Sequence, residues 1–408
     1  MLKIVVSIFS LLFGSAMLIL GTGLQGTLIG LRADIESFSL TTTGIIMSSY
    51  FVGFAIGTYS CPGLIARVGH IRAYAAMATI ASVSAILFAM TTHPAAWIVL
   101  RIITGYTLVG LYMIIESWLN MISPNESRGK FFNTYMLITL LATAGGQYLL
   151  LLYSPNGFEL FAITSILISL ALVPIALTRI RQPELIDTPK LNLAFLYRKS
   201  PQGIFGMLMS GVIVGAFYGM MPVYASKIGL THHEIASLIA ICILGGASLQ
   251  WPIGLISDYY DRRIILAIIS FFASLIAIII YVTGREFIQL YYILNFIFGG
   301  FIFSLYGLSI AHVNDRIKKE QTLEATRGLM QIYGIGAITG PFLASLNMDY
   351  FGAHGIQSFF SATLLILTLF TLLRISVSEA PAEEEHSDFV AMNRTSPVAL
   401  EMSPQTYD

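Results

Sequence analysis

Twelve long apolar runs, each close to the length that crosses a lipid bilayer, fill most of this chain. About 20 consecutive apolar residues span the hydrocarbon core as a helix. Soluble cores do not repeat such lengths twelve times, and 56% of the residues are hydrophobic while 11% are charged. The sequence therefore predicts an all-α membrane protein with twelve transmembrane helices. The runs cover residues 4–30, 43–65, 72–91, 95–121, 131–152, 158–178, 203–226, 234–256, 264–283, 287–312, 328–347 and 356–375.

The basic residues gather in every second gap between these runs. All but four of the 22 Lys and Arg residues lie on the side that holds the N-terminus. The exceptions are Arg32, Lys227 and Arg285 in the alternate gaps, and Arg101 inside a run. Because Lys and Arg concentrate in cytoplasmic loops, we expect both termini in the cytoplasm. The first run is longer than the roughly 7–15 apolar residues of a cleavable signal peptide, so we expect it to remain as the first helix.

One gap is much longer than the others and divides the runs six and six. It covers residues 179–202 and contains three prolines and five basic residues, which is typical of a linker. We therefore expect an N-terminal six-helix bundle at 1–178, a cytoplasmic linker at 179–202 and a second six-helix bundle at 203–376. The acidic, proline-containing segment 377–408 predicts a largely disordered cytoplasmic tail, with a partner-binding tail as the alternative.

The two halves of the chain resemble each other. Three segments match in the same order at similar offsets, which favours an internal repeat over chance recurrence of Gly and Arg-Gly. Two pseudo-symmetric bundles facing each other across a cavity are the construction of alternating-access transporters. The offset of 194 residues aligns Gly105 with Gly299, Leu111 with Leu305, Tyr112 with Tyr306 and Asn120 with Asn314; 192 aligns 62–69 with 254–261; 199 aligns Arg128-Gly129 with Arg327-Gly328.

Two cytoplasmic segments resemble the major facilitator superfamily. Residues 254–263 read Gly-Leu-Ile-Ser-Asp-Tyr-Tyr-Asp-Arg-Arg, close to that family's loop signature Gly-x-Leu-Ala-Asp-Arg-x-Gly-Arg-Arg. The N-terminal copy keeps Arg67 and Gly69 but has Ala66 where the signature has Asp. Arg101 followed by Gly105 is similar to the family's helix 4 motif.

Further segments resemble the YcaD-like branch of that superfamily, a group of bacterial inner-membrane carriers. This resemblance covers residues 1–376 and implies the major facilitator fold and membrane transport, but no particular substrate. The segments are 24–32, Tyr50-Phe51-Val52-Gly53-Phe54, 67–72, Glu116-Ser117-Trp118-Leu119-Asn120 and Ala311-His312-Val313-Asn314-Asp315.

Arg101 is the first candidate for substrate binding. A charge within a membrane span costs roughly 2.5–3.5 kcal/mol and should face protein or a water-filled cavity. The guanidinium offers a fork of donors suited to a carboxylate or phosphate. The alternative is that Arg101 ties its helix to carbonyl groups of a neighbour. In the resembled fold the first, fourth, seventh and tenth helices line the cavity, which adds four candidates: Gln25, Tyr112, Asn295 and Tyr306.

Glu116 lies on the same stripe of its helix as Arg101 and Tyr112. An embedded carboxylate that takes up and releases a proton is a usual means of proton coupling. The alternative is an ion pair between Glu116 and Arg128 or another basic loop residue. His312, near the expected cytoplasmic end of the tenth run, is a second proton-coupling candidate, although it also fits a structural role.

Asp258 ends the eighth run, close to Arg262 and Arg263. A carboxylate there can meet cationic side chains and the positive N-terminus of a neighbouring helix. We interpret it as a gate latch; the pseudo-symmetric latch lacks its carboxylate because Ala66 stands there. The gating candidates are Asp258, Arg262, Arg263, Arg67, Gly69, Arg128 and Arg327.

Several classes of function find no support in the sequence. It has no Gly-x-x-x-x-Gly-Lys-Ser/Thr run for nucleotide phosphates. Cys61 and Cys242 are far apart and lack metal-ligand spacing. A net charge of zero gives no reason to expect nucleic acid. We therefore expect neither an enzyme nor a bound metal or cofactor.

The sequence thus predicts a secondary active transporter, acting as a monomer in the bacterial inner membrane. It would move a small polar or anionic organic solute by alternating access, coupled to H⁺. A proton-driven exporter of amphipathic compounds is an alternative within transport. The alternative outside transport is a membrane receptor or scaffold that kept the fold, for which Ala66 is the only sequence support.

Overall fold

The computed structural model contains twelve helices, among the residues it describes, that are long and apolar enough to cross a membrane. This confirms the predicted all-α fold and makes the chain a multi-pass membrane protein. The described residues are 2–123, 128–177, 193–284, 286–318 and 321–377, with Phe389, Thr395, Ser396 and Val398.

Six of these helices precede the long gap and six follow it. The first six are α1 (Leu2–Ile35), α2 (Leu40–Val68), α3 (His70–Met90), α4 (Pro94–Ile122), α5 (Arg128–Tyr148, extended by the 3-10 turn η2, Leu149–Leu151) and α6 (Glu159–Leu177). The second six are α8 (Pro201–Lys227), α9 (His232–Tyr259), α10 (Arg262–Thr283), α11 (Ile288–Asn314), α12 (Thr322–Phe351) and α13 (Gly355–Val377).

One short helix was not predicted. It is α7 (Leu193–Lys199), within the expected linker, whose residues 179–192 lie outside the described residues. Most of the predicted apolar runs are a few residues shorter than the helices that contain them, because polar residues at the ends continue the helical hydrogen bonds. An exception is α6, whose predicted run 158–178 extends one residue beyond the helix at each end.

Local capping sets the ends of several spans. The Ser39 hydroxyl accepts a hydrogen bond from the Thr42 backbone N–H at 3.1 Å, which starts α2. The Asp261 carboxylate accepts one from the Arg263 N–H at 2.9 Å, which starts α10. Such caps satisfy N–H groups that have no partner inside the helix. Gly69 joins α2 to α3 with φ 87°, a backbone conformation that favours glycine.

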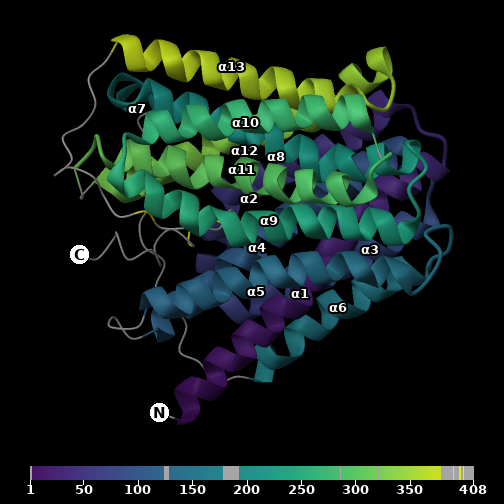
Figure 1. Cartoon of the computed structure of the whole chain (residues 1–408). Helices are drawn as coiled ribbons and strands as arrows, with labels where there is room; N and C mark the ends of the chain where they lie inside the picture. The colour runs from purple at the N-terminus through teal and green to yellow at the C-terminus, as the bar shows by residue number, and fades with distance from the viewer. Residues whose placement is uncertain are drawn as a thin grey trace. The chain divides into compact units, whose positions relative to one another are not determined.

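The chain folds into two compact units, each built from sequential spans. Unit 1 comprises 1–188, 229–237 and 393–403, and unit 2 comprises 189–228, 238–392 and 404–408. In unit 1, α1 packs against α5 and α6, and α2 packs against α4. In unit 2, α8 packs against α12 and α13, and α10 packs against α11 and α13; Figure 1 shows these green and yellow helices running alongside one another.

A glycine crossing holds α2 and α4 together in unit 1. A Cβ on Gly53 would overlap the backbone carbonyl of Ile102, and a Cβ on Gly105 would overlap that of Tyr50. Glycine is required at both positions because the two backbones are in direct contact. Small residues at helix crossings are the usual means of close packing in membranes, where lipid is as apolar as the side chains.

Unit 2 repeats this crossing between α9 and α11. A Cβ on Gly245 would overlap the carbonyl of Phe296, and a Cβ on Gly299 would overlap that of Cys242. Gly245 lies 192 residues after Gly53, and Gly299 lies 194 residues after Gly105. These are the offsets at which the sequence halves align, so the glycine crossing is part of the internal repeat.

A serine pair recurs at similar offsets, 192 residues from Ser82 to Ser274 and 196 residues from Ser165 to Ser361. In unit 1 the Ser82 hydroxyl of α3 lies 2.7 Å from the Ser165 hydroxyl and 3.3 Å from the Ser165 carbonyl oxygen of α6. In unit 2 the Ser274 hydroxyl of α10 lies 2.9 Å from the Ser361 hydroxyl and 3.0 Å from the Ser361 carbonyl oxygen of α13. Two helix contacts of each unit therefore have the same chemistry, which confirms the pseudo-symmetric bundles.

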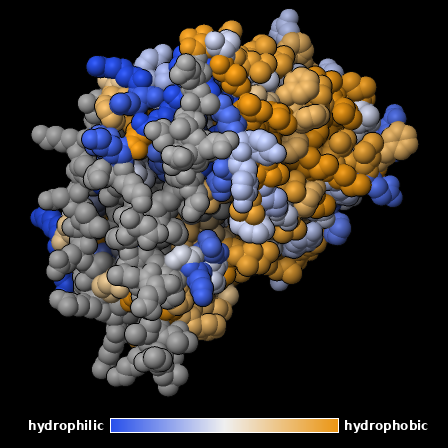
Figure 2. Space-filling model, turned by 60° about the vertical axis from the view of Figure 1, so that its left-hand side comes forward, coloured by the Kyte–Doolittle hydropathy of each residue, from blue (hydrophilic) through white to orange (hydrophobic). Residues whose placement is uncertain are grey.

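The surfaces of the outer helices are apolar. Figure 2 shows hydrophobic residues covering a broad part of the face in view. Large apolar side chains are exposed at helical intervals, such as Ile166, Leu170 and Val173 on α6 and Ile366 and Leu369 on α13. Soluble monomers rarely expose apolar areas of this extent, whereas a lipid-facing surface requires them.

Gly105→Ala should strongly destabilise unit 1, because its Cβ overlaps backbone atoms that cannot move without separating α2 from α4. We expect a loss of at least about 1–3 kcal/mol, the usual cost of overpacking. Gly63→Ala on α2 is the matched control, since no described atom lies within 4 Å of that added Cβ. Thermal unfolding of the purified protein in detergent measures both. Equal melting temperatures for the two variants would contradict the crossing.

Candidate functional site

Arg101 on α4 lies over the aromatic face of Tyr50 on α2. Its guanidinium carbon is 4.7 Å from the ring centroid, and the residue is only 6% exposed. Among the described residues, its Nε has no hydrogen-bond partner. A cation–π contact stabilises the charge by about 0.5–2 kcal/mol without using the hydrogen-bond donors. Arg101 is therefore a buried cation whose donor fork remains available to a ligand.

The glycine crossing places this pair. Tyr50 and Gly53 lie one turn apart on α2, and Arg101 and Gly105 lie one turn apart on α4. Close backbone contact at the glycines brings the neighbouring Tyr50 ring under the guanidinium. The sequence left open an alternative role, in which Arg101 bonds to a carbonyl group of a neighbouring helix. Among the described residues, the Nε of Arg101 makes no such hydrogen bond. The sequence interpretation missed Tyr50, although its position one turn before Gly53 was a usable signal.

Glu116 is the second embedded charge of α4, and it is fully buried. Tyr135 of α5 donates its hydroxyl to Glu116 Oε1 at 3.0 Å. Thr395 donates to Oε1 and Ser396 donates to Oε2, both from the C-terminal segment of unit 1. Three hydroxyl donors therefore face this carboxylate. The side chain of Arg128, the ion-pair partner considered above, lies outside the described residues.

Tyr112 belongs with Glu116 rather than with Arg101. Its hydroxyl lies 3.4 Å from the Thr22 hydroxyl of α1. It also lies close enough to Tyr74 and Tyr135 to interact electrostatically with both. Eleven residues separate Arg101 from Tyr112 along α4, about 16 Å at the rise of an α-helix. The predicted stripe of α4 therefore carries two separate polar sites.

Gln25 on α1 is 1% exposed, and its side-chain Nε2 has no hydrogen-bond partner among the described residues. The polar link between α1 and α5 is made by Gln147 instead. Its Oε1 accepts from the Thr27 hydroxyl at 2.5 Å, and its Nε2 donates to the Gly23 carbonyl at 3.1 Å. Gln147 was not identified from the sequence, because an amide without a charge gives no distinctive pattern there.

The two candidates on α11 lie in the packed interior of unit 2. Asn295 donates to the Tyr291 carbonyl at 2.8 Å, and its Oδ1 lies 3.8 Å from the Cys242 sulfur. Cys242 is the repeat equivalent of Tyr50, and Asn295 is the equivalent of Arg101. The Tyr306 ring packs edge-on against Tyr333 at 5.2 Å. The charged pair of unit 1 thus has a neutral counterpart in unit 2.

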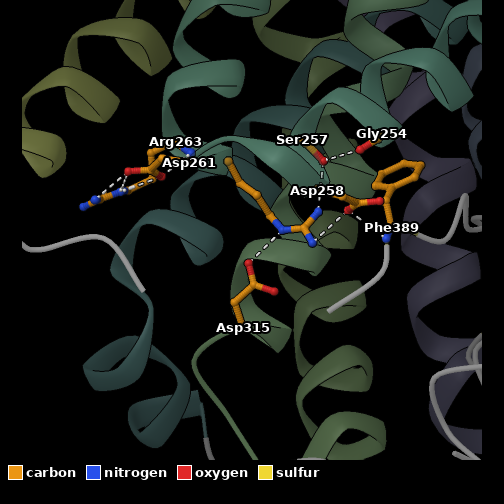
Figure 3. A network of polar contacts seen from close by, with 8 residues as sticks. Gly254, Ser257, Asp258, Asp261, Arg263, Asp315 and Phe389 are labelled. Carbon is orange, nitrogen blue, oxygen red and sulfur yellow. Dashed lines mark hydrogen bonds and ion pairs between the residues drawn. The ribbon is translucent and has the colours of Figure 1, made fainter. Parts of the chain in front are cut away.

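Arg262 is the centre of an ion-pair network in unit 2 (Figure 3). Its Nε donates to Asp315 Oδ2 at 2.7 Å, and its two other nitrogens reach Asp258 Oδ1 at 3.0 Å and the Ser257 hydroxyl at 2.9 Å. The side chains of Arg262 and Asp315 are each 1% exposed. Asp315 was missed as a partner, because only the fold brings the end of α11 against the start of α10.

A second pair adjoins this network. Arg263 binds Asp261 with a shortest distance of 2.7 Å and also donates to the Arg374 carbonyl at 3.4 Å. Burial acts to raise the pKa of Asp261, but hydrogen bonds from Arg263 outweigh it and lower that pKa below its ordinary value. His312, 3% exposed, lies near Arg316 and Arg263. His312 lies in unit 2 and Glu116 lies in unit 1, so the two proton-coupling candidates are not in the same unit.

The remaining gating candidates lie at span ends. Arg67 is exposed on the last turn of α2, two residues before the C-cap Gly69. Arg128 begins α5, and Arg327 lies partly buried on α12. Among the described residues no cluster of His, Cys, Asp or Glu has the arrangement of a metal site.

Comparison with known proteins identifies the family. The model of the Major Facilitator Superfamily matches residues 11–322 and 203–401. The uncharacterized MFS-type transporter YcaD of Escherichia fergusonii is 26% identical over 366 residues, which are 89% of this chain and 94% of that protein. YcaD of Shigella flexneri is 26% identical over 369 residues, with the same coverage.

Two solved structures share the fold. The nucleoside transporter NupG superposes with a TM-score of 0.75 at 15% identity, covering 90% of this chain and 98% of that one. A bacterial homolog of the human lysosomal transporter Spinster, in an inward-facing and occupied conformation, gives 0.73 at 13% identity, covering 93% and 97%. The repeated helix crossings, the loop signatures and these similarities agree: the chain belongs to the Major Facilitator Superfamily, a family of transporters, and is similar to its YcaD-type members.

Proposed function

We propose that this protein is a secondary active transporter that moves a small polar or anionic organic solute across the bacterial inner membrane by alternating access. The single observation that carries the solute class is Arg101. It is a buried cation, supported by the Tyr50 ring, with an Nε that no described group satisfies. A guanidinium in such a site binds a carboxylate or phosphate through two parallel hydrogen bonds.

The substrate class follows from this charge and not from the relatives. The likeness to the nucleoside transporter lies far below the identity at which a substrate could be carried over. A carboxylate or phosphate on the solute would replace the water that Arg101 needs, which a neutral solute does less well. The charge pattern of the loops supports cytoplasmic termini, and a monomer is sufficient because both bundles come from one chain.

Proton coupling is proposed for Glu116. The carboxylate is fully buried on α4, and its partners in unit 1 include the hydroxyls of Tyr135, Thr395 and Ser396. A carboxyl group inside a transmembrane helix, packed in an apolar interior, can take up and release a proton where an exposed carboxylate would stay ionised. Such a group can alternate between the protonated and ionised forms during a transport cycle. Tyr135 would position it through the 3.0 Å hydrogen bond.

Asp258 and Arg262 are proposed as part of a cytoplasmic gate. Asp258 is the more exposed partner of Arg262, with 20% of its side chain accessible, whereas Asp315 is buried. An exposed partner can be exchanged between conformations more readily than a buried one. We therefore assign Asp315 to holding Arg262 in place and Asp258 to the latch.

Arg101→Lys should weaken binding of the solute about 10–100-fold while leaving folding nearly intact, because the charge remains but the fork of donors is lost. Thermal shift of the purified protein against a panel of small carboxylates and phosphates identifies a ligand and measures its binding. Arg198→Lys, at an exposed position on α7, is the control and should bind as the native chain does. Collapse of both Arg101→Lys and Arg101→Gln would indicate a scaffold role instead.

Glu116→Gln should abolish proton-driven uptake into proteoliposomes but retain exchange of labelled for unlabelled solute. The amide keeps the size and a hydrogen-bond acceptor, but it cannot carry a proton. Flux with and without an imposed pH gradient separates the two modes. Native proteoliposomes that show no solute-dependent flux with any ligand found by thermal shift would favour a receptor. Proton-driven uptake that survives in Glu116→Gln would place the coupling elsewhere.

Asp315→Asn should lower the thermal stability strongly, by about 3–5 kcal/mol, because it leaves a buried guanidinium without its closest carboxylate. Asp258→Asn should leave stability nearly unchanged and increase cysteine labelling at the cytoplasmic mouth, since the latch is weakened in one state. Labelling at both mouths that stays at the native level in a folded Asp258→Asn would remove Asp258 from the gate.

A further inference from the structure

The C-terminal segment binds inside unit 1. Thr395 and Ser396 are 8% and 0% exposed, and their hydroxyls donate to the two carboxylate oxygens of Glu116. The Ser396 hydroxyl also accepts from the Val398 N–H at 3.1 Å, which closes a local turn. Composition predicts a solvated tail, but these residues are packed, because a buried carboxylate offers acceptors that the hydroxyls can satisfy.

The same segment has an anchor in unit 2. The Phe389 backbone N–H donates to Asp258 Oδ1 at 3.0 Å (Figure 3). A Cβ on Gly254 would overlap the Phe389 ring, and a Cβ on Gly307 would come within 2.8 Å of it. Two glycines on α9 and α11 therefore form a notch that the ring fills. Phe389 is the nearest neighbour of both added atoms, so the notch fits this side chain.

We propose that Thr395 and Ser396 act as an internal ligand of unit 1, with their hydroxyls on the carboxylate of Glu116, and that Phe389 anchors the same tail within unit 2 by filling the glycine notch. While this ligand is bound, both oxygens of Glu116 are occupied and the proton-coupling group is covered. Transport is therefore low when the segment is docked and high when it leaves. The effect on transport rests on the proposed function of Glu116, whereas the docking itself does not.

The chemistry of the contact explains why this segment is held. A carboxylate in an apolar interior is costly unless donors surround it. Thr395 and Ser396 add two donors to the one from Tyr135. Hydroxyl donors carry no charge, so each of their hydrogen bonds to the carboxylate is weaker than a hydrogen bond from an Arg or Lys would be. The interaction is strong enough to seat the segment and remains reversible.

Docking is measured first, without transport. A single cysteine in place of Val398 reports access to a membrane-impermeant maleimide applied to the purified protein; the two native cysteines, Cys61 and Cys242, are buried. Gly254→Ala should raise the labelling rate roughly tenfold, the population change that follows a loss of about 1.4 kcal/mol. Gly334→Ala is the matched control, because no described atom lies within 4 Å of its added Cβ. The control should label at the native rate.

A second variant perturbs the other end of the contact. The double substitution Thr395→Ala and Ser396→Ala should also raise labelling of the Val398 cysteine, because it removes two donors to Glu116. Thr134→Ala with Ser376→Ala controls for loss of two hydroxyls, since both are exposed and bond to carbonyls of their own helices. A Gly254→Ala protein that does not fold is replaced by Gly307→Ala, whose added Cβ comes within 2.8 Å of the Phe389 ring. Truncation after Ser378 removes the reporter position but no part of a transmembrane helix, and it serves for the transport measurement.

Transport is measured next in proteoliposomes. The truncated protein and the Thr395→Ala, Ser396→Ala variant should take up solute several-fold faster than the native chain. A synthetic peptide of residues 386–400 should slow the truncated protein again, and the same peptide with both alanines should not. Adding the peptide isolates the segment from any other effect of truncation.

The outcomes separate the two proposals. If labelling rises in the variants but no protein, the native chain included, shows flux, the docking proposal stands and the transport proposal is rejected. Native flux, with labelling unchanged in Gly254→Ala and in the double alanine variant and with transport rates unchanged in the double alanine variant and in the truncated protein, would reject the internal ligand and leave transport standing. Raised labelling with unchanged flux rates would show docking that does not regulate, and would overturn the regulatory part of the proposal.

Discussion

The contact of bare helix backbones at paired glycines is the constraint on which the rest of each unit depends. In a membrane the surrounding lipid is as apolar as a leucine side chain, so helices gain little by burying apolar residues against each other. Close approach of backbones replaces that driving force with van der Waals contact. At Gly53 and Gly105, and again at Gly245 and Gly299, no larger residue fits. These crossings determine which side chains of α4 and α11 meet a neighbour.

The two units share this scaffold but differ in their polar chemistry. The position of Arg101 over Tyr50 in unit 1 is filled by Asn295 beside Cys242 in unit 2. At the loop signature, the charged residue lies in unit 2 instead of unit 1. Unit 2 has Arg262 in an ion-pair network, whereas the equivalent His70 of unit 1 has its ring near Trp118 at 5.7 Å. The internal repeat thus supplies one backbone frame twice, and each half has been given a different charged site.

The C-terminal residues fit this division, because Thr395 and Ser396 contact Glu116 within unit 1 and Phe389 contacts Asp258 within unit 2. Glu116 and Asp258 both carry carboxylates that accept hydrogen bonds from these residues. A buried carboxyl group is costly unless it is protonated or accepts hydrogen bonds. A bound proton and the hydroxyls of Thr395 and Ser396 can therefore stabilise Glu116 at different times. Regulation through such a contact would need no additional binding site, since the group proposed to couple protons is the group that Thr395 and Ser396 cover.

The sequence by itself determined the class of fold, the number of spans and the internal repeat. These depend on hydropathy, which acts over each run of about 20 residues, and on glycine positions, which recur at constant offsets. It also singled out Arg101, Glu116 and Arg262 as unusual charges for their places in the chain. Most of their partners could not be found in this way: Tyr135, Asp315 and the hydroxyls near the C-terminus carry no pattern that points to them, and Tyr50 is indicated only by its place one turn before Gly53. Only tertiary structure brought them together, because each contact joins different helices, or a helix and the tail, through the packing of backbones and side chains.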